Sequence, residues 1–503
     1  MCENESTCKR RPSNIPETFY TFDDVILVPK HESSIASRRD VDISSSVTGK
    51  IKLENPVISS YMPAVTGHEM AIAMARDAKG LGIIHRSMTI EDQAREIELV
   101  KRAESRIIGD PYTISTSATV GDVKRQLKQL KVGMLLVAND RDKILRGVVS
   151  TRDVDLEEDE SLSVVNVMTP FDELVVGQPN ITSSDAKKLL KTHRLENIPL
   201  VDDKGMIKGL VSKKDLGKME NEFVSRDEDG RLLVGASIGL RGKDYLDRAT
   251  ACLQAGADLI VIAVANGYLS SVVEATRILR SNFPNIDIAV GCTADYYGTM
   301  NLFEAGADTV LVGIGPGSVC ETRVVAGVGK PQFSALLDAQ RAARQAGKHI
   351  ISDGGVHEPH HFNKAIFAGA SGVILGSALA GTDESPGEIK SLNGTLFKAQ
   401  WGLASDRARR DFDALHGEDR DEEDYPANMH IAAEGVEEGL TPYTGNAREA
   451  IMRITGGIRS CMTYMAASDI PTLWKRCNEG LWGVVTDAGL KESKPHHLYD
   501  IRT

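Results

Sequence analysis

Short apolar runs alternate with longer amphipathic stretches along most of the chain, and the alternation becomes regular from about residue 231. The runs are nearly continuous in apolar residues, which is typical of strands buried on both faces of a parallel sheet. The stretches between them, such as YLDRATACLQAGA (245–257), have helical spacing. This alternation is the α/β pattern. Buried strands are predicted at LLVGAS (232–237), DLIVIAV (258–264), DIAVGC (287–292), TVLVGIG (309–315), HIISDGG (349–355) and GVILGS (372–377).

A short phrase recurs at three points where a predicted helix ends and the next strand begins. AGAD occurs at 255–258 and 305–308, and AGAS at 368–371. Glycine is the usual terminator of a helix. Repeated units of this kind predict an α/β fold of the (β/α)8 TIM-barrel type, with the first strands in NPVISSYM (55–62) and KGLGIIH (79–85). A doubly wound sheet is the competing interpretation, but it would need fewer units.

Residues 106–221 interrupt this pattern with a sequence of different character. GVVSTRD (147–153) and GLVSKKD (209–215) form an internal repeat, and each follows an apolar strand candidate. We interpret this segment as two small α/β modules in tandem, inserted between barrel parts at 1–105 and 222–503; one irregular insertion is the alternative. The acidic run DLEEDES (155–161) is expected to be a solvated linker between the modules.

The stretch SDRARRDFDALHGEDRDEEDYPAN (405–428) is poor in apolar residues and rich in both signs of charge. Such a segment can bury little, so a mobile loop or flap is predicted at about 405–433. A surface helix with charge pairs four residues apart is the alternative.

Composition narrows the class of protein. A chain of 503 residues with 41% hydrophobic and 26% charged residues fits a multidomain globular protein. No apolar run reaches about 18 residues and no secretory signal is recognisable, so we expect a cytoplasmic protein that neither spans a membrane nor is secreted. The net charge of −12 argues against specific nucleic-acid binding. The cysteine count is odd and lacks any C-x-x-C pair, which fits free thiols in a reducing compartment.

One cysteine stands apart from the other six because of its loop. In GIGPGSVCETRVVAGVGKPQ (313–332), glycines surround Cys320 just past a predicted barrel strand. Glycine lets such a loop wrap a phosphate with its backbone N–H groups, and Ser318 adds a hydroxyl. Thr322 and Arg323 follow at once, and a thiolate is a strong nucleophile when nearby charges lower its pKa. Cys320 is therefore the candidate nucleophile, whereas the other cysteines are expected to be packing residues.

Two further glycine-rich strand ends follow. ISDGGVH (351–357) places Asp353 before Gly354 and Gly355, and ILGSALAG (374–381) places Gly376 and Ser377 after a strand. The late strand ends of a barrel commonly form a phosphate site. Asp353 offers lone pairs that can accept both hydroxyls of a ribose.

A carboxylate lies just beyond these strand ends, in TDESPGE (382–388). Glu384 near Thr322 would make a proton relay. A solvated acidic turn is the equal alternative.

With these motifs the chain resembles the IMP dehydrogenase/GMP reductase family over nearly its whole length. The cysteine loop is close to the family pattern GxGxGSxCxTR…GxGxPQ, and YTFDDVILVPK (20–30), GIIHRSM (82–88), SDGG and DESPG also look like family motifs. The inserted pair resembles CBS modules, whose motif aspartates would be Asp153 and Asp215.

The resemblance implies a shared chemistry at C2 of a purine nucleotide. The Cys320 thiolate would form a covalent thioimidate, and a hydride would pass between C2 and NADPH or NAD. Thr322 and Glu384 match the activating pair. The substrate-binding positions match Ser318, Asp353, Gly354, Gly355, Gly376 and Ser377, and the cofactor side matches Ala265, Asn266, Gly267, Tyr268 and Gly313.

Between the two branches, the details favour GMP reductase, which converts GMP to IMP and ammonia. ANGY (265–268), WGLAS (401–405) and CMTYMAAS (461–468) look like reductase motifs, and the dehydrogenase's Arg-Tyr pair has no clear match at Arg420 and Tyr425. IMP dehydrogenase stays open because of the CBS-like insert, VVAGVGKPQ and EGVEEGLTPYTG (434–445). The third hypothesis is a homologue that binds nucleotides under the control of its CBS-like pair and has weak or altered catalysis. Ala263, Thr293, Pro63 and Arg86 depart from both branches.

Three further expectations come from the resemblance alone. The CBS-like pair would bind adenine or guanine nucleotides. A potassium ion would be held by backbone carbonyls of Gly315, Gly317 and Cys320. The protein would be a homotetramer that can pair into an octamer.

Overall fold

The computed structural model describes residues 17–103, 111–130, 132–139, 143–179, 181, 183–213, 224–240, 244–416 and 432–493. The chain forms two compact units. One combines Met1–Val100 with Leu233–Thr503, and the other is Lys101–Leu232. The second unit begins five residues before and ends eleven residues after the insert expected from sequence at 106–221.

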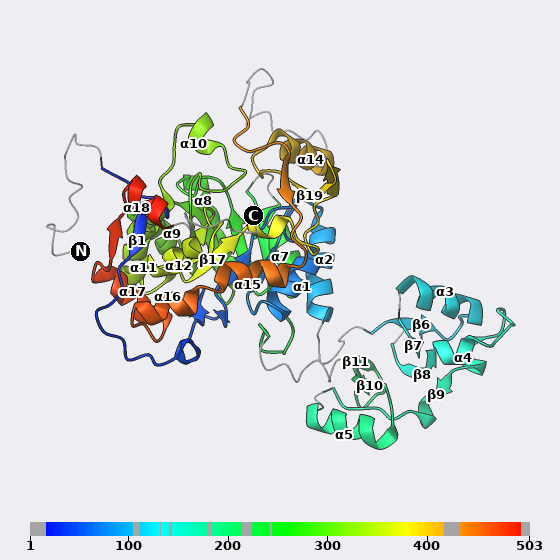
Figure 1. Ribbon diagram of the computed structural model, residues 1–503. Coiled ribbons are helices and arrows are strands. Elements are labelled where there is room, and N and C mark those ends of the chain that lie inside the picture. The colour runs from blue at the N-terminus through cyan, green and yellow to red at the C-terminus, as the bar shows by residue number, and fades with distance from the viewer. Residues whose placement is uncertain are drawn as a thin grey trace. The chain divides into compact units, whose positions relative to one another are not determined.

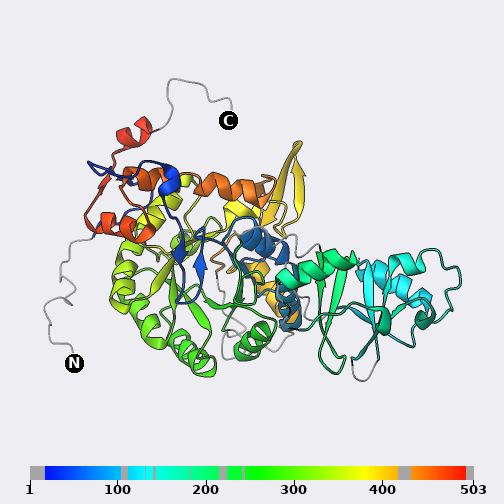
Figure 2. The ribbon, with the colours of Figure 1, turned by 90° about the horizontal axis from the view of Figure 1, so that it is seen from below.

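The larger unit is a closed barrel of parallel strands, so the predicted TIM barrel is confirmed (Figures 1 and 2). Every apolar run singled out in the sequence supplies one strand. The order around the barrel is β12 (Val234–Ile238), β13 (Leu259–Ala263), β14 (Asp287–Thr293), β15 (Thr309–Val312), β16 (His349–Asp353), β17 (Gly372–Leu375), β4 (Val57–Ser59) and β5 (Leu81–Ile84), and β5 pairs with β12 to close the ring. A doubly wound sheet would leave two open edges, which this ring does not have.

Helices cover the outside of the barrel between successive strands, as Figure 2 shows. They are α1 (His68–Arg76), α2 (Ile90–Ala103), α7 (Tyr245–Gln254), α8 (Ser270–Asn282), α9 (Tyr296–Ala305), α11 (Gln332–Ala346), α12 (Pro359–Phe367), α13 (Ser377–Ala380) and α15 (Ala447–Thr455). The repeated glycines end three of these helices: Gly256, Gly306 and Gly369 have φ of 102°, 113° and 110°. Only glycine takes this left-handed backbone without strain, which explains why AGAD and AGAS recur.

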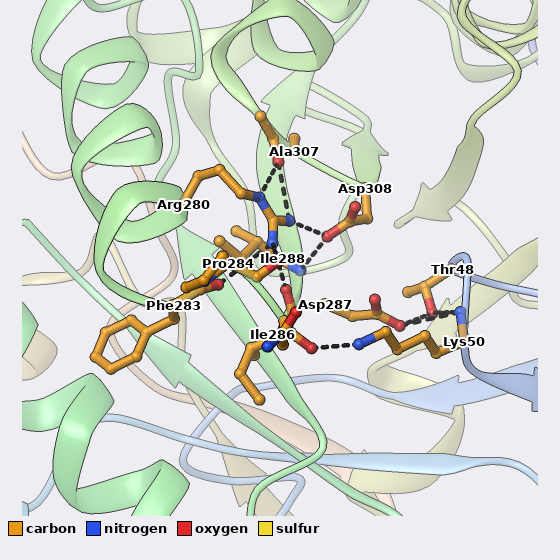
Figure 3. Close-up of polar contacts among 12 residues, drawn as sticks. Thr48, Lys50, Arg280, Phe283, Pro284, Ile286, Asp287, Ile288, Ala307 and Asp308 are labelled. Carbon is orange, nitrogen blue, oxygen red and sulfur yellow. Dashed lines mark hydrogen bonds and ion pairs between the residues drawn. The ribbon is translucent and has the colours of Figure 1, made fainter.

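Polar side chains close the amino-terminal end of the barrel (Figure 3). Arg280 on α8 donates to the backbone oxygens of Phe283, Pro284, Ile286 and Gly306, and it pairs with the Asp308 carboxylate. Asp308 also accepts the N–H of Ile288 in the neighbouring strand at 2.8 Å. Asp308, the aspartate of the second AGAD, therefore links β14 to the start of β15. Interactions at this amino-terminal end of a barrel typically serve stability, because active sites lie at the other end.

Smaller elements surround the barrel. They are the pair β1 (Val25–Leu27) and β21 (Trp482–Val484), the pair β2 (Ser45–Ser46) and β3 (Lys52–Leu53), the sheet β18 (Ile389–Leu392), β19 (Thr395–Gln400) and β20 (Gly439–Pro442), and the helices η1 (Arg38–Asp40), α10 (Thr322–Val325), α14 (Asp406–His416), α16 (Ile458–Tyr464), α17 (Ile470–Asn478) and α18 (Asp487–Glu492).

The start of the predicted flap is a helix. Residues 406–416 form α14, so the surface-helix alternative describes this part of the chain, and the expectation of a loop there was wrong. Arg410 pairs with Glu437 beyond the flap. Residues 417–431, which include Arg420 and Tyr425, lie outside the described residues.

The second unit contains two similar halves. The first holds β6 (Thr113–Ser115), α3 (Val120–Leu130), β7 (Met134–Ala138), β8 (Leu145–Ser150), α4 (Thr151–Val154), η2 (Val164–Asn166), β9 (Thr169–Pro170) and η3 (Phe171–Glu173), and the second holds α5 (Ser183–His193), β10 (Asn197–Val201) and β11 (Ile207–Ser212). In each half the repeated sequence forms the second strand of an antiparallel pair, β7 with β8 and β10 with β11.

The acidic run does not link the two halves as expected. Its side chains are mostly exposed, but the backbone folds back on the start of α3, where Gly121 N–H donates to the Glu160 carbonyl at 3.0 Å. Lys124 donates to the Glu157 carbonyl at 2.8 Å. The chain then returns to the sheet of the first half through β9, which pairs with β8, so the run belongs to that half.

Candidate active site

The cysteine loop begins where β15 ends and leads into α10. Gly313 has a φ of 154°, and a Cβ at this position would lie 2.0 Å from the Asp353 carbonyl oxygen. Gly315 has a φ of 81° and is packed against the aliphatic part of Arg323. These two glycines let the loop pass close to the end of β16. The loop therefore needs its glycines for close backbone approach as well as for freedom of conformation.

Cys320 and Thr322 lie side by side at the end of this loop. The Cys320 Sγ donates to Thr322 Oγ1 at 3.3 Å, and both residues are half-buried. The predicted nucleophile thus has a hydroxyl within hydrogen-bond reach and is partly exposed. This is the geometry that nucleophilic catalysis with proton transfer requires.

The segment that follows the flap docks on the cysteine loop. Glu321 N–H donates to the Glu434 carbonyl at 2.7 Å, and Val436 N–H donates to the Val319 carbonyl at 3.0 Å. On its other side, Val436 accepts the N–H of Gly402 in WGLAS at 2.9 Å. The post-flap segment therefore bonds directly to the cysteine loop, and WGLAS is linked to that loop through Val436.

A cavity opens beside the cysteine loop, and it brings together every substrate-binding residue predicted from sequence. Its lining comprises Ser60, Met62, Gly317, Ser318, Val319, Asp353, Gly354, Gly355, Val356, His357, Ile374, Gly376, Ser377 and Gln400. The hydroxyls of Ser318 and Ser377 lie 2.9 Å apart, although they come from different strand ends. Hydroxyls and glycine N–H groups at neighbouring barrel ends suit a phosphate. The role of each residue in binding stays a prediction.

Asp353 connects this cavity to the barrel interior. Its Oδ2 accepts the Tyr61 hydroxyl at 2.7 Å and the Cys292 thiol at 3.4 Å. Burial raises the pKa of Asp353, and the bonds from Tyr61 and Cys292 oppose that rise. Cys292 was expected to be a packing residue, and it is buried, but it also serves as a donor to the carboxylate.

Glu384 does not reach Thr322. Its Oε2 accepts the backbone N–H of Ala447 at 2.8 Å, at the first residue of α15. The turn that carries it is held by Lys398, a buried lysine whose Nζ donates to the carbonyls of Thr382 and Ser385 at 2.8 and 2.6 Å. The proton relay suggested for Thr322 and Glu384 is therefore not formed directly in this structure, and it stays a prediction.

The ANGY segment lies at the end of β13 and packs on the neighbouring strand end. Gly267 N–H donates to the Cys292 carbonyl at 2.8 Å, and the Tyr268 hydroxyl accepts the Ala294 N–H at 2.9 Å. A Cβ on Gly267 would lie 2.6 Å from that carbonyl oxygen, so glycine is required there. Burial raises the pKa of Tyr268 to about 12.

The donor set of this segment fits a nicotinamide cofactor. Ala265, Asn266 and part of the Tyr268 ring are exposed and offer an amide and an aromatic face. Two of the departures noted in the sequence lie beneath this surface. Ala263 is 2% exposed inside β13, and the Thr293 hydroxyl is paired with Thr299 at 2.9 Å. Ala263 and Thr293 are therefore buried, and they do not change the exposed groups of this segment.

Two predicted ligand sites are only partly described. The Gly317 carbonyl, one of three proposed for potassium, accepts the Cys320 N–H at 3.0 Å. In the second unit, Asp153 caps α4 by accepting the Ser150 N–H at 2.7 Å. Asp215 lies outside the described residues. The potassium site and the nucleotide role of the two aspartates stay predictions.

Several residues at the cavity were missed from sequence: Ser60, Tyr61, Met62, His357 and Gln400. The first three belong to NPVISSYM, which was read only as a strand. A signal was available, because residues just past a barrel strand lie at the catalytic end. His357 lies 3.4 Å from the Ser377 hydroxyl, and nothing in its sequence neighbourhood indicated this contact.

Comparison with known proteins gives a family for this geometry. Residues 19–496 match the IMP dehydrogenase / GMP reductase domain. The chain belongs to this family. Its members are NAD(P)-dependent oxidoreductases, and the resemblance inferred from the cysteine loop is confirmed.

Relatives from both branches of the family are similar to the chain. It is 41% identical to inosine-5′-monophosphate dehydrogenase of Bacillus subtilis over 480 residues, which cover 95% of each chain. The corresponding enzyme of Staphylococcus aureus strain Mu50 is 40% identical over 95% of this chain and 96% of its own.

Among solved structures, a cysteine-to-alanine variant of GMP reductase from Trypanosoma brucei bound to guanosine 5′-monophosphate has a TM-score of 0.87 at 35% identity, covering 97% of this chain and 99% of its own. The same enzyme with guanosine 5′-triphosphate has a TM-score of 0.75 at 33% identity, with 92% and 97% covered. Within the part of the chain that the structure describes, no helix is both long and apolar enough to cross a membrane.

Proposed function

We propose that this protein is a GMP reductase, which converts GMP and NADPH to IMP, ammonia and NADP. The observation that carries the proposal is the full-length similarity to a GMP-bound GMP reductase, at a TM-score of 0.87 over 97% of the chain. The reductase-like ANGY segment supports it, because the Tyr268 hydroxyl accepts the Ala294 N–H just past β14, where the cofactor would lie.

The chemistry rests on Cys320. Its thiolate attacks C2 of the purine, a C–S bond forms, and the C2–N bond breaks as ammonia leaves. Thr322, whose hydroxyl lies 3.3 Å from the thiol, passes the proton that the leaving nitrogen requires. NADPH held on the cofactor side would supply the hydride for C2, and the C–S bond then breaks so that the Cys320 thiolate returns.

The cavity holds the rest of the nucleotide. Ser318, Ser377 and the glycine N–H groups bind the phosphate, and Asp353 accepts the ribose hydroxyls. Ala265, Asn266, Gly267, Tyr268 and Gly313 form the cofactor side. A Cβ at Gly313 would displace the Asp353 carbonyl, so this glycine also fixes the position of the ribose-binding residue.

IMP dehydrogenase is the second candidate, because the chain is 41% identical to a curated IMP dehydrogenase over 95% of both chains. The two activities use the same thiol and differ in what attacks or leaves at C2. They are separated by offering the purified protein each nucleotide with each cofactor and following absorbance near 340 nm. Oxidation of NADPH with GMP supports the proposal. Reduction of NAD with IMP, without any loss of NADPH, would replace it with the dehydrogenase.

We further propose that the second unit is a tandem CBS pair that senses nucleotides. Its two halves repeat the same strand pair, and Asp153 lies at the matching motif position. ATP or GTP should then change activity or assembly of the intact chain. Kinetics and sedimentation that are the same with and without these nucleotides would contradict this role.

A further inference from the structure

Tyr61, Cys292 and Asp353 form a hydrogen-bonded group across the interior of the barrel. Tyr61 follows β4, Cys292 belongs to β14, and Asp353 ends β16. None of these strands neighbours another in the barrel order, so the bonds span the barrel rather than one strand pair. Tyr61 and Cys292 are 7% and 6% exposed and belong to the apolar cluster that fills the barrel.

The direction of both hydrogen bonds is set by burial. Burial raises the pKa of Tyr61 and of Cys292 well above their ordinary values, and the nearby Asp353 charge raises both further. Both groups therefore keep their protons and donate to the carboxylate. A hydrogen bond to a charged acceptor in a low-dielectric interior is among the stronger kinds.

Both donors use the same oxygen of Asp353. They bond to Oδ2, and among the described residues none donates a hydrogen bond to Oδ1. The side-chain torsion of aspartate is broad, so an unrestrained carboxylate samples many orientations. Two donors from opposite sides of the barrel fix its plane. The backbone is fixed as well, because Gly313 packs directly on the Asp353 carbonyl.

The other carboxylate oxygen, Oδ1, is available to a ligand, and Asp353 lines the cavity in which the nucleotide would bind. We propose that Tyr61 and Cys292 are positioning residues, which orient the Asp353 carboxylate so that Oδ1 meets the ribose hydroxyls of the bound nucleotide. This inference rests on the proposed function, since it requires a purine nucleotide in the cavity. It adds specificity for ribose over deoxyribose as a property that these two side chains control.

The test measures binding instead of turnover, in a Cys320→Ala background. Dissociation constants are determined by calorimetry for GMP and for 2′,3′-dideoxy-GMP, with and without Tyr61→Phe. If Tyr61 acts through Asp353, its hydroxyl matters only when the ribose hydroxyls are present. We expect roughly tenfold weaker binding of GMP and less than about twofold change for the dideoxy nucleotide.

A matched control removes a tyrosine hydroxyl elsewhere. Tyr296 on α9 donates to Gln345 on the outside of the barrel at 2.6 Å, so Tyr296→Phe should change neither constant. Equal weakening of both nucleotides by Tyr61→Phe would overturn the inference, because it would indicate a general disturbance of the cavity. Thermal unfolding of each variant checks that it is folded.

A second pair of variants keeps the inference testable if Tyr61→Phe does not fold. Cys292→Ala removes the other donor and should weaken GMP selectively, whereas Cys292→Ser keeps a donor and should restore selective binding. If both variants lose the preference for GMP over 2′,3′-dideoxy-GMP, or if both keep it, the inference is contradicted. If the Cys320→Ala protein binds no purine nucleotide at all, the proposed function fails and this inference fails with it; binding without the ribose dependence rejects the inference alone.

Discussion

Gly402 and Gly435 face each other at the point where the segments on either side of the flap meet the cysteine loop. A Cβ on Gly402 would lie 2.9 Å from the Gly435 Cα and 2.9 Å from the Val319 carbonyl oxygen. Real Cβ atoms do not approach backbone this closely, so no side chain fits between the three segments. The absence of side chains at these two positions lets residues 434–436 pack closely against the loop that carries Cys320.

Gly402→Ala is therefore expected to lower kcat by at least about tenfold, while the barrel still folds. The added methyl would lie 2.9 Å from both the Gly435 Cα and the Val319 carbonyl oxygen, so it forces the post-flap segment away from the loop and breaks the hydrogen bond from Val436 N–H to Val319. Steady-state kinetics together with thermal unfolding check this. Gly49→Ala is the control, since a Cβ there meets nothing within 4 Å. Unchanged kcat in Gly402→Ala would show that this contact has no catalytic importance.

Glu384 is expected to combine a structural and a chemical role, which two substitutions separate. Its carboxylate accepts the Ala447 N–H at the start of α15, so Glu384→Ala should lower the free energy of unfolding by about 1 kcal/mol. Glu384→Gln keeps an acceptor oxygen but cannot transfer a proton. It should lose at least about tenfold in kcat with unchanged stability. Denaturant unfolding and kinetics of both variants provide the measurement; full activity in Glu384→Gln would remove this residue from the proton relay.

The affinity for nucleotide should depend on the protonation of Asp353. Burial raises the pKa of this carboxyl, so binding through the carboxylate is complete at higher pH and is lost as pH falls through that pKa. The Tyr61 and Cys292 hydrogen bonds lower the pKa, and Tyr61→Phe should therefore move the loss to higher pH.

Dissociation constants of GMP between about pH 5 and about pH 8 test this shift, in the Cys320→Ala protein with and without Tyr61→Phe. The ligand phosphate titrates near pH 6 but does so identically for both proteins, so the comparison isolates Asp353. A shift in the opposite direction, or none, would contradict the assignment.

Arg280 should stabilise the barrel without affecting nucleotide binding. It joins the backbone oxygens at Phe283, Pro284 and Ile286 to the Asp308 carboxylate (Figure 3), at the amino-terminal end of the barrel strands. Arg280→Met removes these donors and is expected to lower the free energy of unfolding by about 2 kcal/mol, with GMP affinity unchanged.

A control lies on the same helix. Within the described part of the chain, Arg277 pairs with Glu274 alone, at 3.4 Å, and it is exposed. Arg277→Met should therefore lower the free energy of unfolding by less than about 0.5 kcal/mol. Equal losses in the two variants, measured by urea unfolding, would mean that the Arg280 network adds no more than an exposed pair.

The sequence by itself determined the barrel and part of the lining of its cavity. Every predicted barrel strand is present, because a strand covered on both faces must be nearly continuous in apolar residues, and that signal is local. The residues Ser318, Asp353 and Ser377 could be placed together because the ends of parallel barrel strands all meet at one face.

Only the tertiary structure decided which side chains meet across that face. The Tyr61–Asp353 bond joins residues 292 positions apart, and no local pattern records such a contact. Likewise, the Glu384 carboxylate accepts a hydrogen bond from the Ala447 N–H and makes none with Thr322. Residues 406–416 form a helix where a loop was expected. The physical reason is the same in each case: a local pattern fixes which face of a strand or helix is buried, whereas barrel closure fixes which distant groups come within hydrogen-bond distance.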